Sequence, residues 1–357
     1  MDRAFESLPL DHPPKRALVC ALDWGLGHVA RTSVLVRRLL AAGASVVLAS
    51  NGRSADWWRA EFPDLELREL PDYAVRYANG PWLVPGLMAS LPRLWRAIRQ
   101  ERSLVESWKG EGFDLVVSDN RYGCRIAGVK SVLLTHQLRL AAPRGLGLFE
   151  GIGERLMARM VRSFDEVWVP DHPGECGLSG RLGHPASPKS FPPICYLGPL
   201  SRMVGAIPDA RWSGPWDMLV LVSGPEPGRT RLEAIARQAL RGKPGRRLLV
   251  RGRPDQALPE SPEGQADWVE AAHLPTNSLV AALRGARRIL SRGGYSTVMD
   301  LDALGILDGR CLWCPTPGQT EQEALARELA LANRGVRIEE RSLRECLERL
   351  PEEDNRI

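Results

Sequence analysis

Two short segments of this 357-residue chain place residues that can do chemistry directly after apolar runs. The first, Asp23-Trp-Gly-Leu-Gly-His28, puts a histidine where a helix would begin. A histidine there can act as general base on a hydroxyl group, because histidine titrates near neutral pH. Arg31 follows at i+3 on the same helical face and can hold an anionic acceptor group. The alternative is a histidine that caps the helix or packs at its start.

The second segment, Ser291-Arg-Gly-Gly-Tyr-Ser-Thr-Val-Met-Asp300, has two glycines between an expected strand and an expected helix. The glycines let the backbone approach a ligand, and the helix N-terminus offers N–H groups with about half a positive charge. This arrangement favours a diphosphate. Ser296 or Thr297 can cap the helix and donate to a phosphate oxygen, and Asp300 can reach a ribose diol. The alternative is a tight turn with an ordinary helix cap.

Two further loops carry polar groups that suit the same ligand. Ser223-Gly-Pro-Glu-Pro-Gly228 follows another apolar run and can wrap a phosphate or a sugar, although a rigid turn explains it equally well. Gln319, Gln322 and Glu323 offer the donors and acceptors that sugar hydroxyls need. Thr320 with Glu323 also matches a helix capping box, which would give this loop a purely structural role.

Short apolar runs alternate with longer amphipathic ones along the whole chain. This alternation predicts parallel sheets that are covered by helices on both faces. Helices are expected over Val29–Ala42, Thr230–Leu240 and Glu321–Ala332, and one that starts near Ser296 and ends by Gly305. The expected strands are Ala17–Leu22, Ser45–Ala49, Asp114–Ser118, Ser131–Thr135, Glu166–Val169, Asp217–Val222, Arg247–Val250, Arg288–Ser291 and Cys311–Cys314.

The chain is long enough for two domains. Gly198 to Pro215 contains Gly-Pro pairs and no periodicity, which indicates a linker, and the alternation restarts after it. We therefore predict an α/β fold with two Rossmann-like, doubly wound parallel-sheet domains facing across a cleft. Ligands of such sheets bind at the carboxyl ends of the strands. We place the domains at residues 1–205 and 206–340, and expect a helix or tail over 341–357 that packs back on the N-terminal domain.

Composition narrows the classes of function. A net charge of +5 suits anionic partners such as nucleotides, but it is too small and too dispersed to indicate nucleic acid. No apolar stretch approaches the ~18 residues of a membrane helix. Met1 to Lys15 lacks the apolar core of a signal peptide, so we expect a cytoplasmic protein. Seven scattered cysteines indicate reduced thiols, and Cys311 and Cys314 fall at i and i+3 of an expected strand, where they cannot chelate one metal ion.

The segment from Tyr73 to Arg102 mixes large apolar residues with arginines. This mixture suits a helix on the surface of an anionic membrane; the alternative, which we favour for such a pattern, is an amphipathic helix packed on the core. Peripheral contact with the inner face of a membrane is therefore one expectation. The residues concerned are Tyr77, Trp82, Leu83, Leu87, Met88, Leu91, Leu94, Trp95 and Ile98, with Arg93, Arg96, Arg99 and Arg102.

Four sequence blocks together resemble the family 28 glycosyltransferases, which include the peptidoglycan lipid-linked N-acetylglucosaminyltransferase. The chain looks closer still to a bacterial branch of that family other than the peptidoglycan enzyme. In order and spacing the blocks span about residues 17 to 335. They are Asp23 to His28, Ser118-Asp-Asn-Arg-Tyr-Gly123, Ser223-Gly-Pro-Glu226, and Ser291 to Thr297 running on to Pro317-Gly-Gln-Thr-Glu-Gln-Glu323.

The resemblance implies a GT-B fold, a UDP-sugar donor in the C-terminal domain, inversion at the anomeric carbon and no metal or other cofactor. Combined with the residue patterns above, it assigns His28 as the catalytic base. The implied donor-binding residues are Ser223, Gly224, Pro225, His273, Leu274, Arg292, Gly293, Gly294, Tyr295, Ser296, Thr297, Asp300, Gln319, Gln322 and Glu323. The implied acceptor-binding residues are Gly25, Gly27, Arg31, Asn120, His136 and Gln137.

Three departures from the peptidoglycan enzyme leave the acceptor and the donor sugar open. Leu26-Gly27 replaces paired glycines, Arg31 replaces a proline, and Glu323 replaces a second glutamine. We therefore expect an inverting, metal-independent glycosyltransferase that moves a hexosyl group, such as N-acetylhexosamine from UDP-GlcNAc, to a hydroxyl acceptor that is lipid-linked or part of the cell envelope. The alternatives are a UDP-sugar 2-epimerase of the same fold and a catalytically silent nucleotide-sugar-binding subunit.

Overall fold

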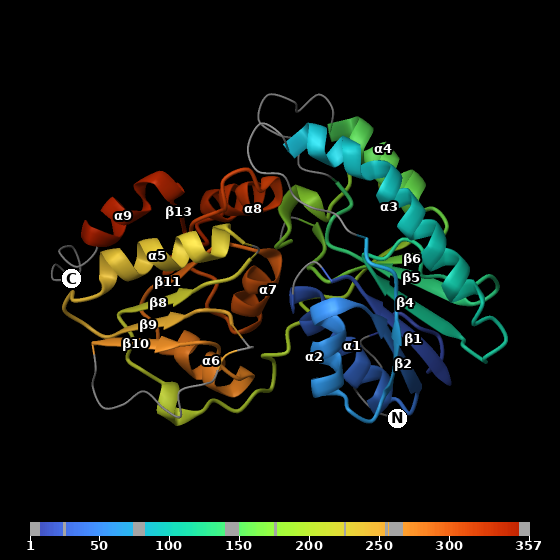
Figure 1. Cartoon of the computed structure of the whole chain (residues 1–357), viewed down its shortest axis with the longest axis horizontal. Helices are drawn as coiled ribbons and strands as arrows, with labels where there is room; N and C mark the ends of the chain where they lie inside the picture. The colour runs from blue at the N-terminus through green and yellow to red at the C-terminus, as the bar shows by residue number, and fades with distance from the viewer. Residues whose placement is uncertain are drawn as a thin grey trace. The chain divides into compact units, whose positions relative to one another are not determined.

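The computed structural model describes residues 8–23, 26–73, 83–139, 150–174, 177–224, 226–253, 256 and 267–349, with side chains for all of these except residues 26, 83–91 and 150. The chain divides into two compact units, Met1–Ser201 and Arg202–Ile357 (Figure 1). The boundary falls inside the segment that the sequence predicts as a linker, Gly198 to Pro215.

The first unit contains a seven-stranded sheet in the order β3-β2-β1-β4-β5-β6-β7. All neighbouring strands of this sheet run parallel. The strand order reverses between β1 and β4, so this is a doubly wound sheet with its switch point there. The strands are β1 (Arg16–Ala21), β2 (Ser45–Ser50), β3 (Glu66–Glu69), β4 (Leu115–Asp119), β5 (Lys130–Leu134), β6 (Glu166–Val169) and β7 (Ile194–Tyr196).

The second unit repeats this plan with a six-stranded sheet in the order β10-β9-β8-β11-β12-β13. Its neighbouring strands are parallel too, and its switch point lies between β8 and β11. The strands are β8 (Met218–Leu221), β9 (Arg247–Val250), β10 (Trp268–Ala271), β11 (Ile289–Ser291), β12 (Cys311–Trp313) and β13 (Val336–Arg337).

Helices connect most of the successive strands and bury one apolar face against each sheet. On α1, for example, Leu35, Val36 and Leu39 are buried, whereas Arg37 and Leu40 are exposed. Figure 1 shows α5 and α6 on opposite faces of the second sheet. The helices are α1 (Leu26–Ala41), α2 (Gly52–Glu61), α3 (Leu83–Glu106), α4 (Glu150–Val161), α5 (Gly228–Leu240), α6 (Thr276–Arg284), α7 (Tyr295–Ala303), α8 (Thr320–Leu331) and α9 (Glu340–Arg349). Single 3-10 turns are η4 (Gly180–Leu182), η5 (Pro188–Ser190) and η6 (Ala210–Trp212).

The predicted fold class, α/β with two Rossmann-like parallel-sheet units, is confirmed by this topology. The last helix differs from our expectation. We predicted that residues 341–357 pack back on the N-terminal domain, but Leu343 and Leu347 of α9 are buried in the core of the second unit. These leucines stand at i and i+4 on an otherwise charged helix, so they form one narrow apolar stripe, which packs against α5. Residues 350–357 lie outside the described part of the chain.

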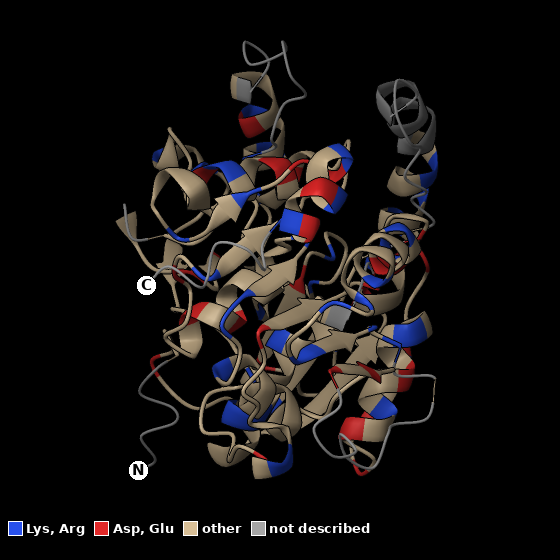
Figure 2. Ribbon diagram, turned by 90° about the vertical axis from the view of Figure 1, so that its left-hand side faces the viewer, with Lys and Arg blue, Asp and Glu red and all other residues tan. Residues whose placement is uncertain are grey.

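Charged residues of both signs are interspersed over the described parts of both units (Figure 2). The net charge of +5 is therefore spread out, as the sequence suggests. Within the described residues, no helix has the length and apolar character that crossing a bilayer requires.

Candidate functional site

The switch point of the first sheet brings a histidine and an aspartate together. His28 lies in the first turn of α1, which follows β1, and Asp119 is the last residue of the adjacent strand β4. The Nδ1 atom of His28 is 2.9 Å from Oδ1 of Asp119. Ligands of doubly wound sheets bind at the carboxyl ends of the strands where the order reverses, so this pair stands where a functional site belongs.

Asp119 is a fully buried carboxylate that stays ionised. Burial raises the pKa of Asp119, but the charges and hydrogen bonds of Arg31 and His28 outweigh this effect and lower the pKa to about 2. An ionised carboxylate only accepts hydrogen bonds, so the proton in the contact with His28 sits on Nδ1 of the ring. A neutral His28 then presents a bare Nε2, and no described residue forms a hydrogen bond to it. This nitrogen can take a proton from a hydroxyl group.

Arg31 lies one helical turn from His28, as predicted, but its side chain has a different partner from the one we expected. We expected it to hold an anionic acceptor, but its side chain is only 2% exposed. Its Nε donates to Oδ2 of Asp119 at 2.7 Å, and its Nη2 contacts Oδ1 of the same carboxylate. A buried guanidinium that is bound to both oxygens of a buried carboxylate is engaged inside the protein, so we withdraw the acceptor role for Arg31.

The next strands supply polar residues at the same edge of the sheet. Asn120 directly follows β4 and has a left-handed backbone, with φ of 54°, which asparagine tolerates better than most residues. His136 follows β5, is 5% exposed, and its Nδ1 lies 3.0 Å from Nη1 of Arg31. Gln137 donates its backbone N–H to Oγ1 of Thr135. Of the remaining predicted acceptor residues, Gly27 lies in the first turn of α1, and Gly25 lies outside the described residues.

A buried ion pair fixes the loop that follows Asp119. Arg121 and Glu101 are both fully buried, and their closest atoms, Nη1 and Oε1, are 2.5 Å apart. Arg121 also donates to the carbonyl of Ala21 at the end of β1, 2.9 Å away. Glu101 in turn accepts a hydrogen bond from the N–H of Gly123 at 2.9 Å. The ends of β1 and β4 are thus tied together, which holds His28 and Asp119 in register.

Asp119 and Arg121 contribute to this site, although neither is among the residues predicted from the sequence. The block Ser118 to Gly123 carries part of the family resemblance, but the resemblance assigns a role only to Asn120 within it. The available signal was the position of Asp119, because a charged residue directly after an apolar run marks the carboxyl end of a buried strand. Two such ends, at β1 and β4, are neighbours in a sheet of this order.

The switch point of the second sheet lies beside an uncapped helix. Gly294 is the N-cap of α7, and no side chain caps the helix. Thr297 and Val298 direct their N–H groups to the carbonyl of Gly294, whereas no described residue accepts a hydrogen bond from the N–H of Ser296. We expected Ser296 or Thr297 to be the cap. The helix instead begins at Tyr295, so these hydroxyls lie within its first turn. A helix end that no side chain caps suits an anion.

The backbone at Gly293 requires a residue without a side chain. Its φ is +67°, a left-handed conformation that other residues adopt at a cost. An added Cβ would also lie 3.3 Å from Cε3 of Trp313. The paired glycines thus allow the sharp turn from β11 into α7.

Arg292, which we predicted to bind the donor, is engaged inside the second unit instead. Its side chain is fully buried, and Nη1 lies 2.6 Å from Oε2 of Glu340 in α9. It also donates to the carbonyls of Gly228 and Cys314. Arg292 therefore joins the loops after β8, β11 and β12 to each other and to the last helix, and its charge is balanced inside the unit.

The loop after β12 is organised by its own polar residues. Gln322 is 7% exposed, and its Oε1 accepts a hydrogen bond from the N–H of Thr316 at 2.8 Å. This contact orients the amide and leaves Nε2 as its donor group. Glu323 accepts from the N–H of Gly318 at 3.1 Å. The alternative capping box of Thr320 with Glu323 does not form, because Gln319 is the N-cap and Thr320 is already helical.

The remaining predicted donor residues lie at or near the same edge of the second sheet. Ser223 and Gly224 follow β8, and Gly224 has a φ of +98°. His273 and Leu274 follow β10, and Leu274 is buried. Asp300 lies half-buried one turn into α7. Pro225 lies outside the described residues.

No three His, Cys, Asp or Glu side chains come together as a set of metal ligands in the described part of the chain. Cys311 and Cys314 are both fully buried, and burial raises the pKa of each thiol to about 11. Cys311 directs its Sγ to the carbonyl of Ile306, whereas Cys314 contacts Arg292. The two thiols thus have separate surroundings.

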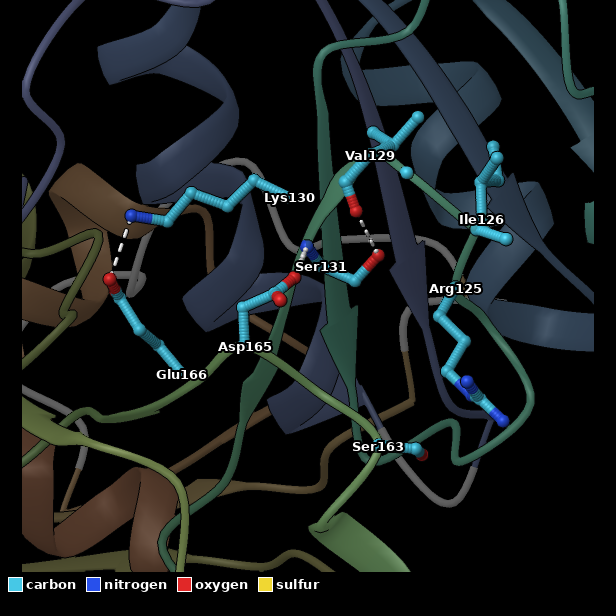
Figure 3. Close-up of a pocket in the computed structure, with 10 residues that line it drawn as sticks. Arg125, Ile126, Val129, Lys130, Ser131, Ser163, Asp165 and Glu166 are labelled. Atoms are coloured by element: carbon cyan, nitrogen blue, oxygen red, sulfur yellow. Dashed lines mark hydrogen bonds and ion pairs between the residues drawn. The ribbon is translucent and has the colours of Figure 1, made fainter.

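A cavity of about 610 Å³ lies at the opposite edge of the first sheet, at the amino ends of β5 and β6 (Figure 3). Lys130 and Glu166, which line it, form an ion pair at 2.7 Å. Asp165 accepts a hydrogen bond from the N–H of Ser131, also at 2.7 Å. These polar groups satisfy one another, and they lie away from the carboxyl ends that bind ligands in this fold. We do not assign the functional site there.

No protein-family model matches the chain, and no curated protein matches it in sequence. Solved structures do resemble it. The glycotransferase of kitacinnamycin has a TM-score of 0.64 and 15% identity, over 97% of this chain and 92% of that chain. MurG of Acinetobacter baumannii has a TM-score of 0.56 and 15% identity, over 94% of this chain and 90% of that chain. UGT89C1 of Arabidopsis thaliana, complexed with UDP-L-rhamnose, has a TM-score of 0.56 and 13% identity, over 96% of this chain and 90% of that chain.

Identities this low bear on the fold alone. The chain has the two-unit Rossmann-like fold of the GT-B glycosyltransferases, as predicted. The similar structures include MurG and a plant enzyme alike, so they support the fold class and not family 28 in particular.

Proposed function

We propose that the chain is an inverting glycosyltransferase that moves a hexosyl group, with N-acetylhexosamine as the proposed sugar, from a UDP-sugar to a hydroxyl acceptor. The observation that carries this proposal is the 2.9 Å contact between His28 and Asp119 at the carboxyl ends of β1 and β4. The similar structures support it, because they include enzymes named as glycosyltransferases, and one of them is complexed with a nucleotide sugar.

In the proposed reaction, Nε2 of His28 takes the proton of the acceptor hydroxyl while the acceptor oxygen bonds to the anomeric carbon. The bond from that carbon to the diphosphate oxygen breaks on the opposite face, so the configuration inverts. The proton ends on His28 and the electron pair leaves with UDP. Asp119 orients the ring and stabilises the positive charge that the ring gains, because its carboxylate stays ionised.

For the donor, we propose that the diphosphate binds at the start of α7. The helix end supplies partial positive charge where the leaving group gains negative charge, and the proposal assigns this task to the helix without a divalent cation. Asp300 is proposed to bind the ribose. Gln322 is proposed to donate from Nε2 to a sugar hydroxyl, because Thr316 already occupies its Oε1.

Replacing His28 by alanine tests the base assignment. The variant should lose transfer while its affinity for UDP, measured by calorimetry, stays within about twofold of the parent, since the donor site is assigned to the other unit. Asp119→Asn should lower kcat by about 10²–10⁴-fold, the usual contribution of general base catalysis. Asp300→Ala is the matched contrast, and it should weaken UDP binding first.

Several outcomes would contradict this function. If His28→Ala transferred sugar at the parent rate, the assignment of His28 as the base would be wrong. If EDTA abolished activity, the helix alone would not account for stabilisation of the leaving group. An epimerised UDP-sugar formed without acceptor would indicate the 2-epimerase. UDP binding without transfer or donor hydrolysis, across a panel of UDP-sugars and acceptors, would indicate a silent binding subunit.

We propose further that the acceptor is lipid-linked and that α3 and α4 contact an anionic membrane. Trp95, Ile152 and Leu156 are large apolar side chains on these helices and are 49%, 52% and 57% exposed. Of the acidic residues whose side chains are described on these helices, Glu101 and Glu154 are buried, and Glu106 is partly exposed and pairs with Arg102. Five arginines are exposed on the same helices and a sixth directly follows α4, which suits anionic lipid; they are Arg93, Arg96, Arg99, Arg155 and Arg159, with Arg162 after the helix.

Only part of the predicted membrane segment is available for such contact. Ile98 and Tyr73 are buried in the core of the first unit, so α3 also packs as an ordinary amphipathic helix. Residues 74–82 and the side chains of 83–91 lie outside the described part. Co-sedimentation with vesicles should retain the parent with anionic lipid, and Trp95→Ala with Leu156→Ala should lower retention. Leu331→Ala, which truncates a leucine of α8 that is 74% exposed, is the control. Equal retention by neutral vesicles would contradict the proposal.

A further inference from the structure

Asp23 stands at the head of the sequence block that ends in His28, but the proposed reaction gives it no role. It follows β1 closely and precedes α1, which begins at Leu26. Its Oδ1 accepts two hydrogen bonds from Ser54, one from the backbone N–H at 3.0 Å and one from the hydroxyl at 2.8 Å. Ser54 is fully buried in the first turn of α2. The connection between β1 and α1 is therefore bound to the start of a different helix.

The first turn of α2 is capped by Asp23 and not by its own N-cap residue. Asn51 occupies the N-cap position with an extended backbone, but its side chain makes no capping hydrogen bond. Its Oδ1 instead accepts from Nη2 of Arg121, the buried arginine after β4. An N-cap side chain usually binds the N–H of the second or third helical residue, and in α2 the carboxylate of Asp23 binds that of Ser54. A carboxylate at this place also suits the positive end of the helix dipole.

Gly52 allows the carboxylate of Asp23 to lie against the helix. The φ of Gly52 is +54°, a conformation that favours glycine. A Cβ added to Gly52 would overlap with Oδ2 of Asp23. Both oxygens of Asp23 are therefore in contact with the start of α2, Oδ1 with Ser54 and Oδ2 with the backbone of Gly52.

The chain between β1 and α1 is thus anchored on two sides. Leu22 donates its N–H to the carbonyl of Asp119 at 3.2 Å, which ties it to β4. Asp23 ties it to α2. His28 lies in the first turn of α1, so the place of its ring depends on where the chain leaves the sheet. The β4 anchor is a backbone contact, whereas the α2 anchor is a side-chain contact that a substitution removes.

We infer that Asp23 is a positioning residue for His28: by capping α2 it fixes the point from which α1 starts, and with it the location of the histidine ring. The catalytic consequence rests on the proposed function, whereas the location of the ring does not. The competing explanation is a cap that stabilises α2 and leaves α1 unaffected.

The test is a proton–carbon NMR spectrum of the full chain with labelled histidine, recorded without ligand. The chain has six histidines, and a His28→Gln variant identifies the signals of that ring. Asp23→Ala should move the His28 signals. Asp23→Asn should leave them near their parent positions, because the amide oxygen can accept both bonds from Ser54.

Ala55→Gly is the matched control. It weakens α2 from a buried position but keeps the cap, so it should not move the His28 signals. The inference is overturned if Asp23→Ala leaves these signals in place, or if Asp23→Asn or Ala55→Gly moves them as far as Asp23→Ala does.

Release of UDP from UDP-GlcNAc, with water as the acceptor, gives the catalytic readout. Asp23→Ala should lower kcat by up to about 10²-fold, the effect that a misplacement of about 1 Å can have. KM should stay within about twofold, since the donor site is assigned to the other unit. Asp23→Asn should restore most of the rate, and Ala55→Gly should keep the parent kcat. A raised KM with an unchanged kcat in Asp23→Ala overturns the positioning role.

Ser54→Ala decides the matter if Asp23→Ala does not fold. It removes one of the two bonds to Oδ1, so it should move the His28 signals by a smaller amount, and unmoved signals overturn the inference. A failure of the proposed function is distinguishable from these results. His28 signals that respond to Asp23→Ala in a chain that releases no UDP would support the inference and contradict the transferase. UDP release by Asp23→Ala at the parent rate, with unmoved signals, would do the reverse.

Discussion

Individual carboxylates in this protein derive their properties from the arginines beside them. Asp119 is fully buried, yet its pKa is about 2, because burial is outweighed by the charges and hydrogen bonds of Arg31 and His28. Glu270 in β10 is another case. A hydrogen bond from Arg237 lowers its pKa, burial opposes this, and the balance brings it from 4.5 to about 2. Such a carboxylate stabilises the fold only while it is ionised.

Glu270 therefore makes stability depend on pH in a defined window. Its pKa is lower in the folded state, so its contribution is fully present above about pH 4.5 and is lost as the pH falls through about 2. Glu270→Gln should lower the free energy of unfolding at pH 7 by about 1 kcal/mol, since the pair is partly exposed. Urea denaturation between pH 7 and pH 3 measures this. The two stability curves should converge as the pH falls, and curves that stay parallel would contradict the assignment.

At this scale the sequence predicted the position of His28 at the start of a helix, but it did not indicate Asp119, which contacts the ring. The first turn of a helix after a strand is local information, and it was enough to place His28. Its partner is 91 positions away, and the two meet only because β4 pairs with β1. The same distance explains the error at Arg31. Its helical position was predicted, but the buried carboxylate that binds it was not.

Among the elements, α9 is joined to the proposed diphosphate site. Glu340 at the start of α9 pairs with buried Arg292, which precedes the paired glycines, and with Arg231 of α5 at 3.2 Å. The leucines of α9 fill the core beside α5. The position of the glycine loop should therefore depend on a helix that touches no ligand in our account.

Glu340→Gln should lower the free energy of unfolding by about 3–5 kcal/mol, because it leaves the buried charge of Arg292 without its partner. UDP affinity should fall as well, since the glycine loop is displaced. Denaturation and calorimetry of the full chain measure both effects. Glu339→Gln is the matched control: Glu339 pairs with Arg341, which is 85% exposed, so the cost should stay below about 1 kcal/mol. Equal effects of the two substitutions would contradict this account of α9.

The elements also show where the sequence was informative. Nine strands were predicted within one or two residues at each end. The four that were not predicted, β3, β7, β10 and β13, are the outer strands of the two sheets. An outer strand has fewer buried positions, as the sequence Glu-Leu-Arg-Glu of β3 illustrates. β3 has no apolar run to follow, and β7, β10 and β13 are only two to four residues long, too short for a clear period.

Across the whole molecule, both units use one topological plan. Each sheet reverses its strand order once, between β1 and β4 in the first and between β8 and β11 in the second. The residues that could take part in binding or catalysis lie at the carboxyl ends of these strands. They are His28 and Asp119 in one unit and the glycine loop in the other. The alternation of short apolar and longer amphipathic runs along the sequence predicted this plan. It could not predict the buried pairs, Arg121 with Glu101 and Arg292 with Glu340, that hold the loops in place.

The central claim is that the second unit binds a nucleoside diphosphate at the start of α7. A crystal structure of the full chain with UDP tests it most directly. The account predicts diphosphate oxygens about 2.7–3.2 Å from N–H groups of the first turn of α7, including that of Ser296. UDP bound at another place, with the first turn of α7 free of phosphate, would contradict it.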